Sequence, residues 1–136
     1  MASIRTFLVD DNATARRAVA TYLAMTPGIE VVGQASDGRE ALAAVPLCQP
    51  DLVLMDWTMP GLSGLEATQQ LTAQGAAPPV VLLTLHEGAE YAQAAAAAGA
   101  AGLVSKAAVG EQLLPLLAGP FPVLGAAPRD LAAAAT

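Results

Sequence analysis

Residues 52–56 read LVLMD, an apolar run that ends on a carboxylate, and three further segments follow the same plan. Residues 7–11 read FLVDD, residues 80–84 read VVLLT and residues 103–106 read LVSK. Short, almost wholly apolar runs are typical of strands buried on both faces of a parallel sheet, and the carboxyl ends of such strands share the edge where ligands bind. The polar residues that end the four runs are therefore predicted to meet in one pocket. They are Asp10, Asp11, Asp56, Thr84 and Lys106.

Strand-like and helix-like segments alternate through about residue 118. Strands are expected at residues 4–9, 29–33, 52–55, 80–83 and 102–105. A helix-like segment follows each strand, the fourth at residues 87–98 and the last at residues 110–118, where Pro115 should kink the helix or delay its start. Five β-α units with right-handed crossovers predict an α/β domain with a five-stranded, doubly wound parallel sheet.

The composition is that of a compact globular protein, with 54% apolar and 13% charged residues. No run of about 18 large apolar residues occurs, so a membrane-spanning helix is not expected. No basic segment precedes an apolar one at the N-terminus, as a secretory signal requires. The net charge of −6 argues against direct binding of nucleic acid. Cys48 is the only cysteine, so no intrachain disulfide can form and the reducing cytoplasm is the expected location.

The carboxylates of the predicted pocket suit transfer of a phosphoryl group to an aspartate. Asp56 can attack phosphorus and give an acyl phosphate if it is ionised and accessible. Asp10 and Asp11 beside it would repel its charge unless a cation is bound. Mg²⁺ suits such a site because it takes one or two carboxylates and keeps several waters. The expected metal-binding set is Asp10, Asp11, Asp56 and the backbone carbonyl of Thr58, with Asp11 as the direct ligand and Asp10 acting through water.

Two further side chains are expected to contact the phosphoryl oxygens. Lys106 is the only lysine in the chain and offers a compact positive charge, while Thr84 offers a hydroxyl. Without metal, Lys106 would also pair with Asp56.

With all five positions filled in this order, residues 3–118 resemble the receiver domain of two-component response regulators. Residues 27–33, PGIEVVG, and residues 35–42, ASDGREAL, are similar to the LuxR/NarL-type branch of that family. The resemblance implies the flavodoxin-like receiver fold with strand order 2-1-3-4-5. It also implies that a sensor histidine kinase phosphorylates Asp56 in a Mg²⁺-dependent reaction, with Thr84 as the switch hydroxyl and Lys106 as the invariant lysine.

Residues 1–118 are accordingly expected to form the receiver domain, and residues 119–136 a linker or tail. Members of this branch usually carry a C-terminal helix-turn-helix DNA-binding domain, for which this tail is too short. The chain is expected to be a stand-alone receiver or one cut from a longer regulator, controlling transcription through a domain that it lacks. It should be no enzyme beyond self-phosphorylation and self-dephosphorylation. A homodimer on activation is compatible with the resemblance.

Among the departures from the family pattern, two bear on kinetics and signal transmission. Leu85 follows Thr84 where the family prefers a small residue, so it should narrow the route to Asp56 and slow both phosphorylation and hydrolysis. Leu103 stands where a switch tyrosine or phenylalanine is usual, so the signal should be transmitted with little aromatic gating. Neither departure removes a group that forms the acyl phosphate.

Three other functions fit parts of this pattern. A phosphatase of the haloacid dehalogenase type also uses an aspartate nucleophile and Mg²⁺, but it needs a carboxylate at the position of Thr58. A flavin carrier on the same fold would need a hydroxyl- and glycine-rich phosphate loop in place of Asp10 and Asp11. A receiver-shaped interaction module that is never phosphorylated stays open because of Leu85 and Leu103.

Overall fold

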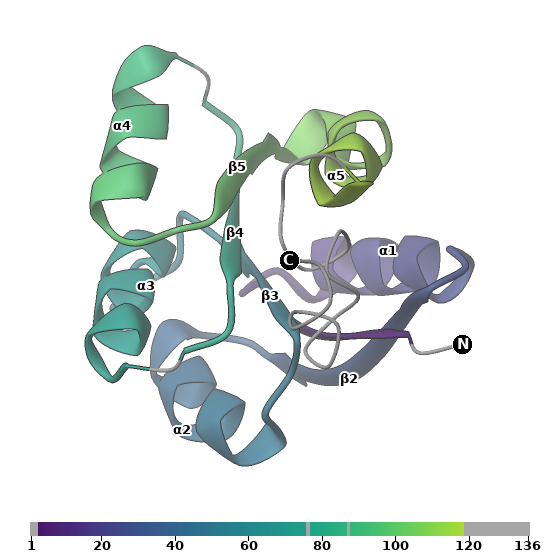
Figure 1. Cartoon of the computed structure of the whole chain (residues 1–136), viewed down its shortest axis with the longest axis horizontal. Helices are drawn as coiled ribbons and strands as arrows, with labels where there is room; N and C mark the ends of the chain where they lie inside the picture. Colours follow the sequence, from purple (N-terminus) through teal and green to yellow (C-terminus); the bar gives the residue numbers. More distant parts are fainter. Residues whose placement is uncertain (1–2, 76, 87, 119–136) are drawn as a thin grey trace.

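The apolar runs of the sequence form five short parallel strands at the centre of the molecule (Figure 1). This computed structural model describes residues 3–75, 77–86 and 88–118. The strands are β1 (Ile4–Val9), β2 (Ile29–Ala35), β3 (Leu52–Asp56), β4 (Val80–Thr84) and β5 (Gly102–Ser105). Their order in the sheet is β2-β1-β3-β4-β5, which confirms the predicted fold and strand order.

Helices connect the strands, and polar side chains at their N-termini explain where several of them begin. The helices are α1 (Ala13–Ala24), α2 (Gly38–Cys48), α3 (Gly64–Ala73), α4 (Ala89–Ala97) and α5 (Val109–Ala118), with a 3₁₀ turn η1 (Lys106–Ala108) before α5. Asn12, Asp37 and Ser63 each accept a hydrogen bond from a backbone N–H in the first turn of their helix. Such caps satisfy donors that the helix itself leaves unpaired.

The helices cover the sheet in two layers, so both faces of the strands are buried. Side chains of α1 and α5 pack on one face, around Leu23 and Leu113. Side chains of α2, α3 and α4 pack on the other, around Val45, Leu71 and Ala95. Figure 1 shows α1 and α5 on one side of the strands and α2, α3 and α4 on the other. None of the helices among the described residues is long and apolar enough to cross a membrane.

The last helix corrects one expectation. It begins at Val109, well before Pro115, so of the two expected effects of this proline, a kink or a delayed start, the delay does not occur. A proline removes one N–H bond to the carbonyl four residues earlier, and the turn before that carbonyl is unaffected. The backbone stays helical through position 115. The predicted first residue of the fourth helix, at position 87, and the predicted tail, 119–136, lie outside the described residues.

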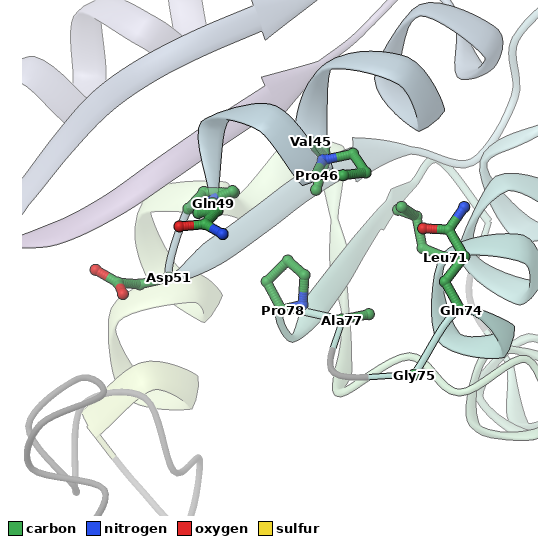
Figure 2. Close-up of a pocket in the computed structure, with 10 residues that line it drawn as sticks. Val45, Pro46, Gln49, Asp51, Leu71, Gln74, Gly75, Ala77 and Pro78 are labelled. Carbon is green, nitrogen blue, oxygen red and sulfur yellow. The ribbon is translucent and has the colours of Figure 1, made fainter.

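A cleft of about 570 Å³ lies at the amino ends of β3 and β4, between the ends of α2 and α3 (Figure 2). Its lining includes Val45, Gln49, Leu71 and Pro78. None of the site residues predicted from the sequence lines it. The predicted chemistry therefore belongs to the opposite, carboxyl edge of the sheet.

Candidate functional site

Three aspartates converge at the carboxyl edge of the sheet. Strand pairing places Val9 beside Met55, so the residues that follow them, Asp10 and Asp56, emerge together from neighbouring strands. Each of Asp10, Asp11 and Asp56 offers a carboxylate oxygen, and these oxygens all lie within 4.8 Å of one another. Asp10 and Asp56 are buried, whereas Asp11 is exposed. The structure thus brings together the three acids that the sequence predicted.

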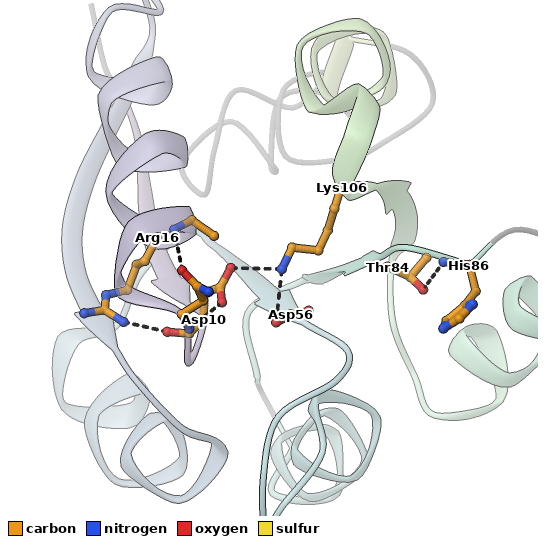
Figure 3. A network of polar contacts seen from close by, with 8 residues as sticks. Asp10, Arg16, Asp56, Thr84, His86 and Lys106 are labelled. Carbon is orange, nitrogen blue, oxygen red and sulfur yellow. Dashed lines mark hydrogen bonds and ion pairs between the residues drawn. The ribbon is translucent and has the colours of Figure 1, made fainter.

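Lys106 joins this cluster from η1, directly after β5 (Figure 3). Its Nζ lies 3.2 Å from Oδ2 of Asp56, to which it donates a hydrogen bond. The same nitrogen lies 3.3 Å from Oδ2 of Asp10. One ammonium therefore faces both buried carboxylates, and the expected pairing of Lys106 with Asp56 is present.

Asp10 leaves one carboxylate oxygen for a further ligand. Its Oδ1 accepts a hydrogen bond from the backbone N–H of Asn12 at 2.9 Å. Its Oδ2 is buried and accepts no hydrogen bond among the described residues, although the Lys106 ammonium is near. A buried anionic oxygen in this condition is suited to a cation or to a water bound to one. The donor set therefore fits Mg²⁺, which prefers carboxylate oxygens.

The charges at the site shift the pKa values of Asp56 and Lys106. Burial raises the pKa of Asp56 from 3.8 to about 6, and the Asp10 charge adds to this effect while Lys106 opposes it. Burial lowers the pKa of Lys106, but the charges of Asp56 and Asp10 outweigh burial and leave that pKa raised. Without metal the site thus favours a charged Lys106 and disfavours ionisation of Asp56.

Thr84 ends β4 at the same edge, between β3 and β5, and is buried. Its Oγ1 accepts a hydrogen bond from the backbone N–H of His86 at 3.0 Å. Among the described residues this hydroxyl makes no hydrogen bond to Asp56 or Lys106. Figure 3 shows Thr84 bonded to His86 on the far side of Lys106 from Asp10. The structure places the predicted hydroxyl beside the site with its oxygen engaged elsewhere.

The two departures from the family pattern occupy different environments. The side chain of Leu85 stands at the surface, with 73% of the residue exposed. Leu103 is partly buried and packs against the cluster beneath α2, α3 and α4. Thr58 is exposed, and its backbone lowers the pKa of Asp56. The effect of Leu85 on reaction rate stays a prediction.

Two residues near the site were not identified from the sequence. Arg16, on the second turn of α1, donates from Nη1 to the backbone carbonyl of Asp10 at 2.6 Å. Tyr91, on α4, stacks on His86 with ring centroids 5.2 Å apart, and it meets Trp57 edge-on at 5.5 Å. Arg16 lies only one turn into the helix that follows Asp10 and Asp11, so its place in the sequence could have indicated that it lies near the end of β1. No local pattern marks Tyr91, because its partners come from two separate loops.

Comparison with known families gives one match over most of the chain. The family described as the response regulator receiver domain matches residues 6–118. This range includes every residue of the site at the carboxyl edge of the sheet.

Similar proteins carry the same segment within longer chains. A protein-glutamate methylesterase/protein-glutamine glutaminase 5 of Myxococcus xanthus is 44% identical over 76% of this chain and 30% of its own length. The transcriptional regulatory protein LiaR of Bacillus subtilis is 41% identical over 60% of this chain and 38% of its own length. The crystal structure of a LuxR-family two-component response regulator from Aurantimonas is 34% identical, with a TM-score of 0.78 over 83% of this chain and 81% of that one. The chain spans well under half the length of these two curated relatives.

Proposed function

Because this chain belongs to the response regulator receiver domain family, we propose that Asp56 is its phosphoacceptor and that a sensor histidine kinase supplies the phosphoryl group. One observation carries this proposal. Lys106 Nζ lies 3.2 Å from Asp56 Oδ2 and 3.3 Å from Asp10 Oδ2, in a cluster with the carboxylate of Asp11. A nucleophile, an acid pair and a compact cation in one pocket suit transfer of a charged group.

The chemical step joins phosphorus to a carboxylate oxygen of Asp56. The P–N bond of a phosphohistidine donor breaks as the new P–O bond forms, and the imidazole leaves with the electrons of the broken bond. Asp56 must be ionised to attack phosphorus. Its pKa of about 6 lies below neutral pH, so the carboxylate is still largely charged there. The Lys106 ammonium then pairs with the phosphoryl oxygens, and this interaction strengthens as negative charge develops on them during the reaction.

The acid pair is proposed to hold Mg²⁺ together with Asp56 and the backbone carbonyl of Thr58. When bound, Mg²⁺ would neutralise the acids and the incoming phosphoryl oxygens. Within the protein, Asp10 keeps Oδ1 on the Asn12 N–H and has Oδ2 left for the ion or its water. Asp11 is exposed and is the acid that can reach the ion from the solvent side.

Several features of the whole protein are proposed on the same basis. The chain acts as a phosphoacceptor and has no activity beyond its own phosphorylation and dephosphorylation. It works in the cytoplasm and controls transcription through an output domain outside this chain, as the names of its LuxR-family and LiaR relatives support. Activation is accompanied by formation of a homodimer. The main alternative to control of transcription is control of an enzymatic output domain, because one relative is named as a methylesterase.

Intact-mass measurement after incubation with acetyl phosphate tests the proposal. Wild-type chain and the Asp56→Asn variant are compared in MgCl₂ and in EDTA. Asp37→Asn is the matched control, because it makes the same chemical change at the N-cap of α2, where asparagine caps as well as aspartate does.

Wild type and Asp37→Asn should gain one phosphate in MgCl₂ and none in EDTA. Asp56→Asn should gain none under either condition. Labelling of Asp56→Asn at the wild-type rate would refute the assignment of the acceptor. Wild type that is never labelled, by acetyl phosphate or by a phosphorylated kinase, would favour the interaction module without phosphorylation.

A further inference from the structure

Arg16 holds the backbone that joins the acids of the candidate metal site. Its Nη1 lies 2.6 Å from the carbonyl oxygen of Asp10, and the contact is partly buried. Figure 3 shows the guanidinium reaching from α1 to the end of β1, on the side of Asp10 away from Lys106. A charge-assisted hydrogen bond of this length restrains its acceptor more firmly than a neutral one does.

The remaining polar groups of Asp10 show how complete this restraint is. Its N–H donates to the carbonyl of Ala35 on β2 at 3.2 Å, and its Oδ1 accepts from Asn12 N–H at 2.9 Å. The carbonyl oxygen of Asp10 accepts a hydrogen bond from Arg16. Among the polar atoms of Asp10, only Oδ2 is then left without a hydrogen bond in the described structure, and that oxygen faces the acid cluster. Each contact comes from a different part of the chain.

Asp11 depends on the same carbonyl for its direction. The peptide unit is planar, so fixing the Asp10 carbonyl also fixes the Asp11 N–H and the position of its Cα. Among the described residues no hydrogen bond or ion pair holds the exposed Asp11 side chain. The Arg16 contact thus acts directly on the carbonyl of the peptide from which this carboxylate extends.

We propose that Arg16 is a positioning residue for the divalent cation, which it serves by fixing the peptide between Asp10 and Asp11. The proposal rests on the proposed function to the extent that Mg²⁺ is the ion bound. It makes Arg16 a supporting group that sets the direction of a metal ligand without contacting the metal. Groups that orient metal ligands typically change metal affinity by about 10- to 100-fold when they are removed.

The sign of the effect separates positioning from simple charge. Arg16 carries a positive charge near the acid cluster, so its charge alone would weaken binding of a cation, and its removal would strengthen binding. Positioning predicts the opposite, because an unrestrained Asp11 must be ordered when the ion binds. Arg17 provides the control, since it is the next residue of α1, lines with Arg16 a second cleft beside that helix, and carries the same charge.

The test is a titration of the whole chain with Mn²⁺, in which electron paramagnetic resonance counts the free ion, followed by displacement with Mg²⁺. Wild type is compared with Arg16→Ala, Arg16→Gln and Arg17→Ala, each verified as folded by circular dichroism. Labelling by acetyl phosphate over a range of Mg²⁺ concentrations gives a second readout. It separates the Mg²⁺ concentration for half-maximal rate from the rate at saturation.

Arg16→Ala should weaken Mg²⁺ binding about tenfold and raise the half-maximal Mg²⁺ concentration by the same factor. The labelling rate at saturating Mg²⁺ should stay within about twofold of wild type, because the acids are then held by the ion itself. Arg17→Ala should bind Mg²⁺ as wild type does or slightly more tightly. If Arg16→Ala does not fold, Arg16→Gln decides with the same expected direction.

The proposal is overturned if the folded Arg16 variants bind Mg²⁺ as tightly as wild type, or if Arg17→Ala loses as much affinity. A loss confined to the labelling rate at saturating Mg²⁺ overturns it as well. Failure of wild type to bind the cation refutes the Mg²⁺ part of the proposed function itself. The two failures are therefore distinguishable.

Discussion

Lys106 and Asp56 are 50 residues apart in the sequence, and Nζ of the lysine lies 3.2 Å from Oδ2 of the aspartate. The lysine reaches the aspartate from the end of β5, which lies two places away from β3 in the sheet. Asp10 faces the same ammonium at 3.3 Å. In the metal-free protein this lysine therefore partly neutralises the acid cluster, a role in which a bound Mg²⁺ would compete with it.

Replacement of Lys106 by alanine should separate metal binding from phosphoryl transfer. Mg²⁺ should bind at least as tightly as in wild type, because a competing cation is removed. Labelling of Asp56 at saturating Mg²⁺ should fall about a hundredfold, because the ammonium stabilises charge that develops on the phosphoryl group. Rates of labelling by acetyl phosphate, measured by intact mass, would show this. Lys106→Arg should recover little, since a planar guanidinium does not replace a compact ammonium. Wild-type rates in Lys106→Ala would contradict the assigned role.

The raised pKa of Asp56 predicts that the free energy of unfolding of the metal-free protein decreases as the pH rises. A pKa of about 6 in the folded protein, against 3.8 as the ordinary value, means that ionisation of Asp56 destabilises the fold. The contribution of protonated Asp56 to the free energy of unfolding is therefore complete below about pH 4, and it is lost as the pH rises through about 6. Asp56→Asn should then be more stable than wild type at about pH 7.5, by roughly 1–3 kcal/mol, and similar to it near pH 4.

Urea unfolding of both proteins in EDTA measures this difference at each pH. Addition of MgCl₂ should stabilise wild type more than Asp56→Asn and so narrow the difference. An Asn variant whose advantage is the same near pH 4 as at neutral pH would contradict the electrostatic explanation.

Leu85 should slow the reactions of Asp56, as its position after Thr84 predicts. Because 73% of the residue is exposed, little of its side chain is held in place by packing, and Leu85→Ala should speed labelling only a few-fold. The lifetime of the acyl phosphate should shorten by a similar factor, since water uses the same approach. Time courses of labelling and decay measure both quantities. No change in either would show that the side chain leaves the approach open.

Tyr91 should carry the effect of phosphorylation to α4. It stacks on His86, whose N–H is held by the Thr84 hydroxyl, and it contacts Trp57, which follows Asp56. When Thr84 turns toward a phosphoryl oxygen, the His86 N–H loses its acceptor and the stack should shift. The emission of Trp57, the only tryptophan, should change on phosphorylation in wild type and in Tyr91→Phe, but not in Tyr91→Ala.

Labelling rates serve as the control for this experiment. Among the described residues no hydrogen bond joins Tyr91 to any of the three acids, so the rates should stay close to wild type. If the emission change persists in Tyr91→Ala, Tyr91 does not transmit the signal. An aromatic residue near this site is thus supplied by α4, as Tyr91, whereas β5 has Leu103 at the position where the family usually has an aromatic residue.

Sequence patterns predicted most of this fold because its strands are buried on both faces. Such strands read as short apolar runs, and the run at 52–56 cannot be moved by one residue without displacing Asp56 from the sheet edge. Ser63 and Glu66 have the sequence spacing of a capping box, and they form one at the start of α3. Of the two effects expected of Pro115, a kink or a delayed start, the delay does not occur, because a proline acts on a single turn and the helix begins earlier.

The sequence by itself determined which chemical groups stand at the carboxyl edge, since strand ends in a parallel sheet share one edge and each run has one polar end. Tertiary structure alone decided how these groups are held. The pKa of Asp56 depends on burial and on the charges of Lys106 and Asp10, which follow two other strands. The Arg16 bond to Asp10 and the position of Tyr91 between Trp57 and His86 depend on side-chain reach and ring orientation. Such contacts are set by distances between elements that lie far apart in the chain, and a linear pattern of residue types does not contain those distances.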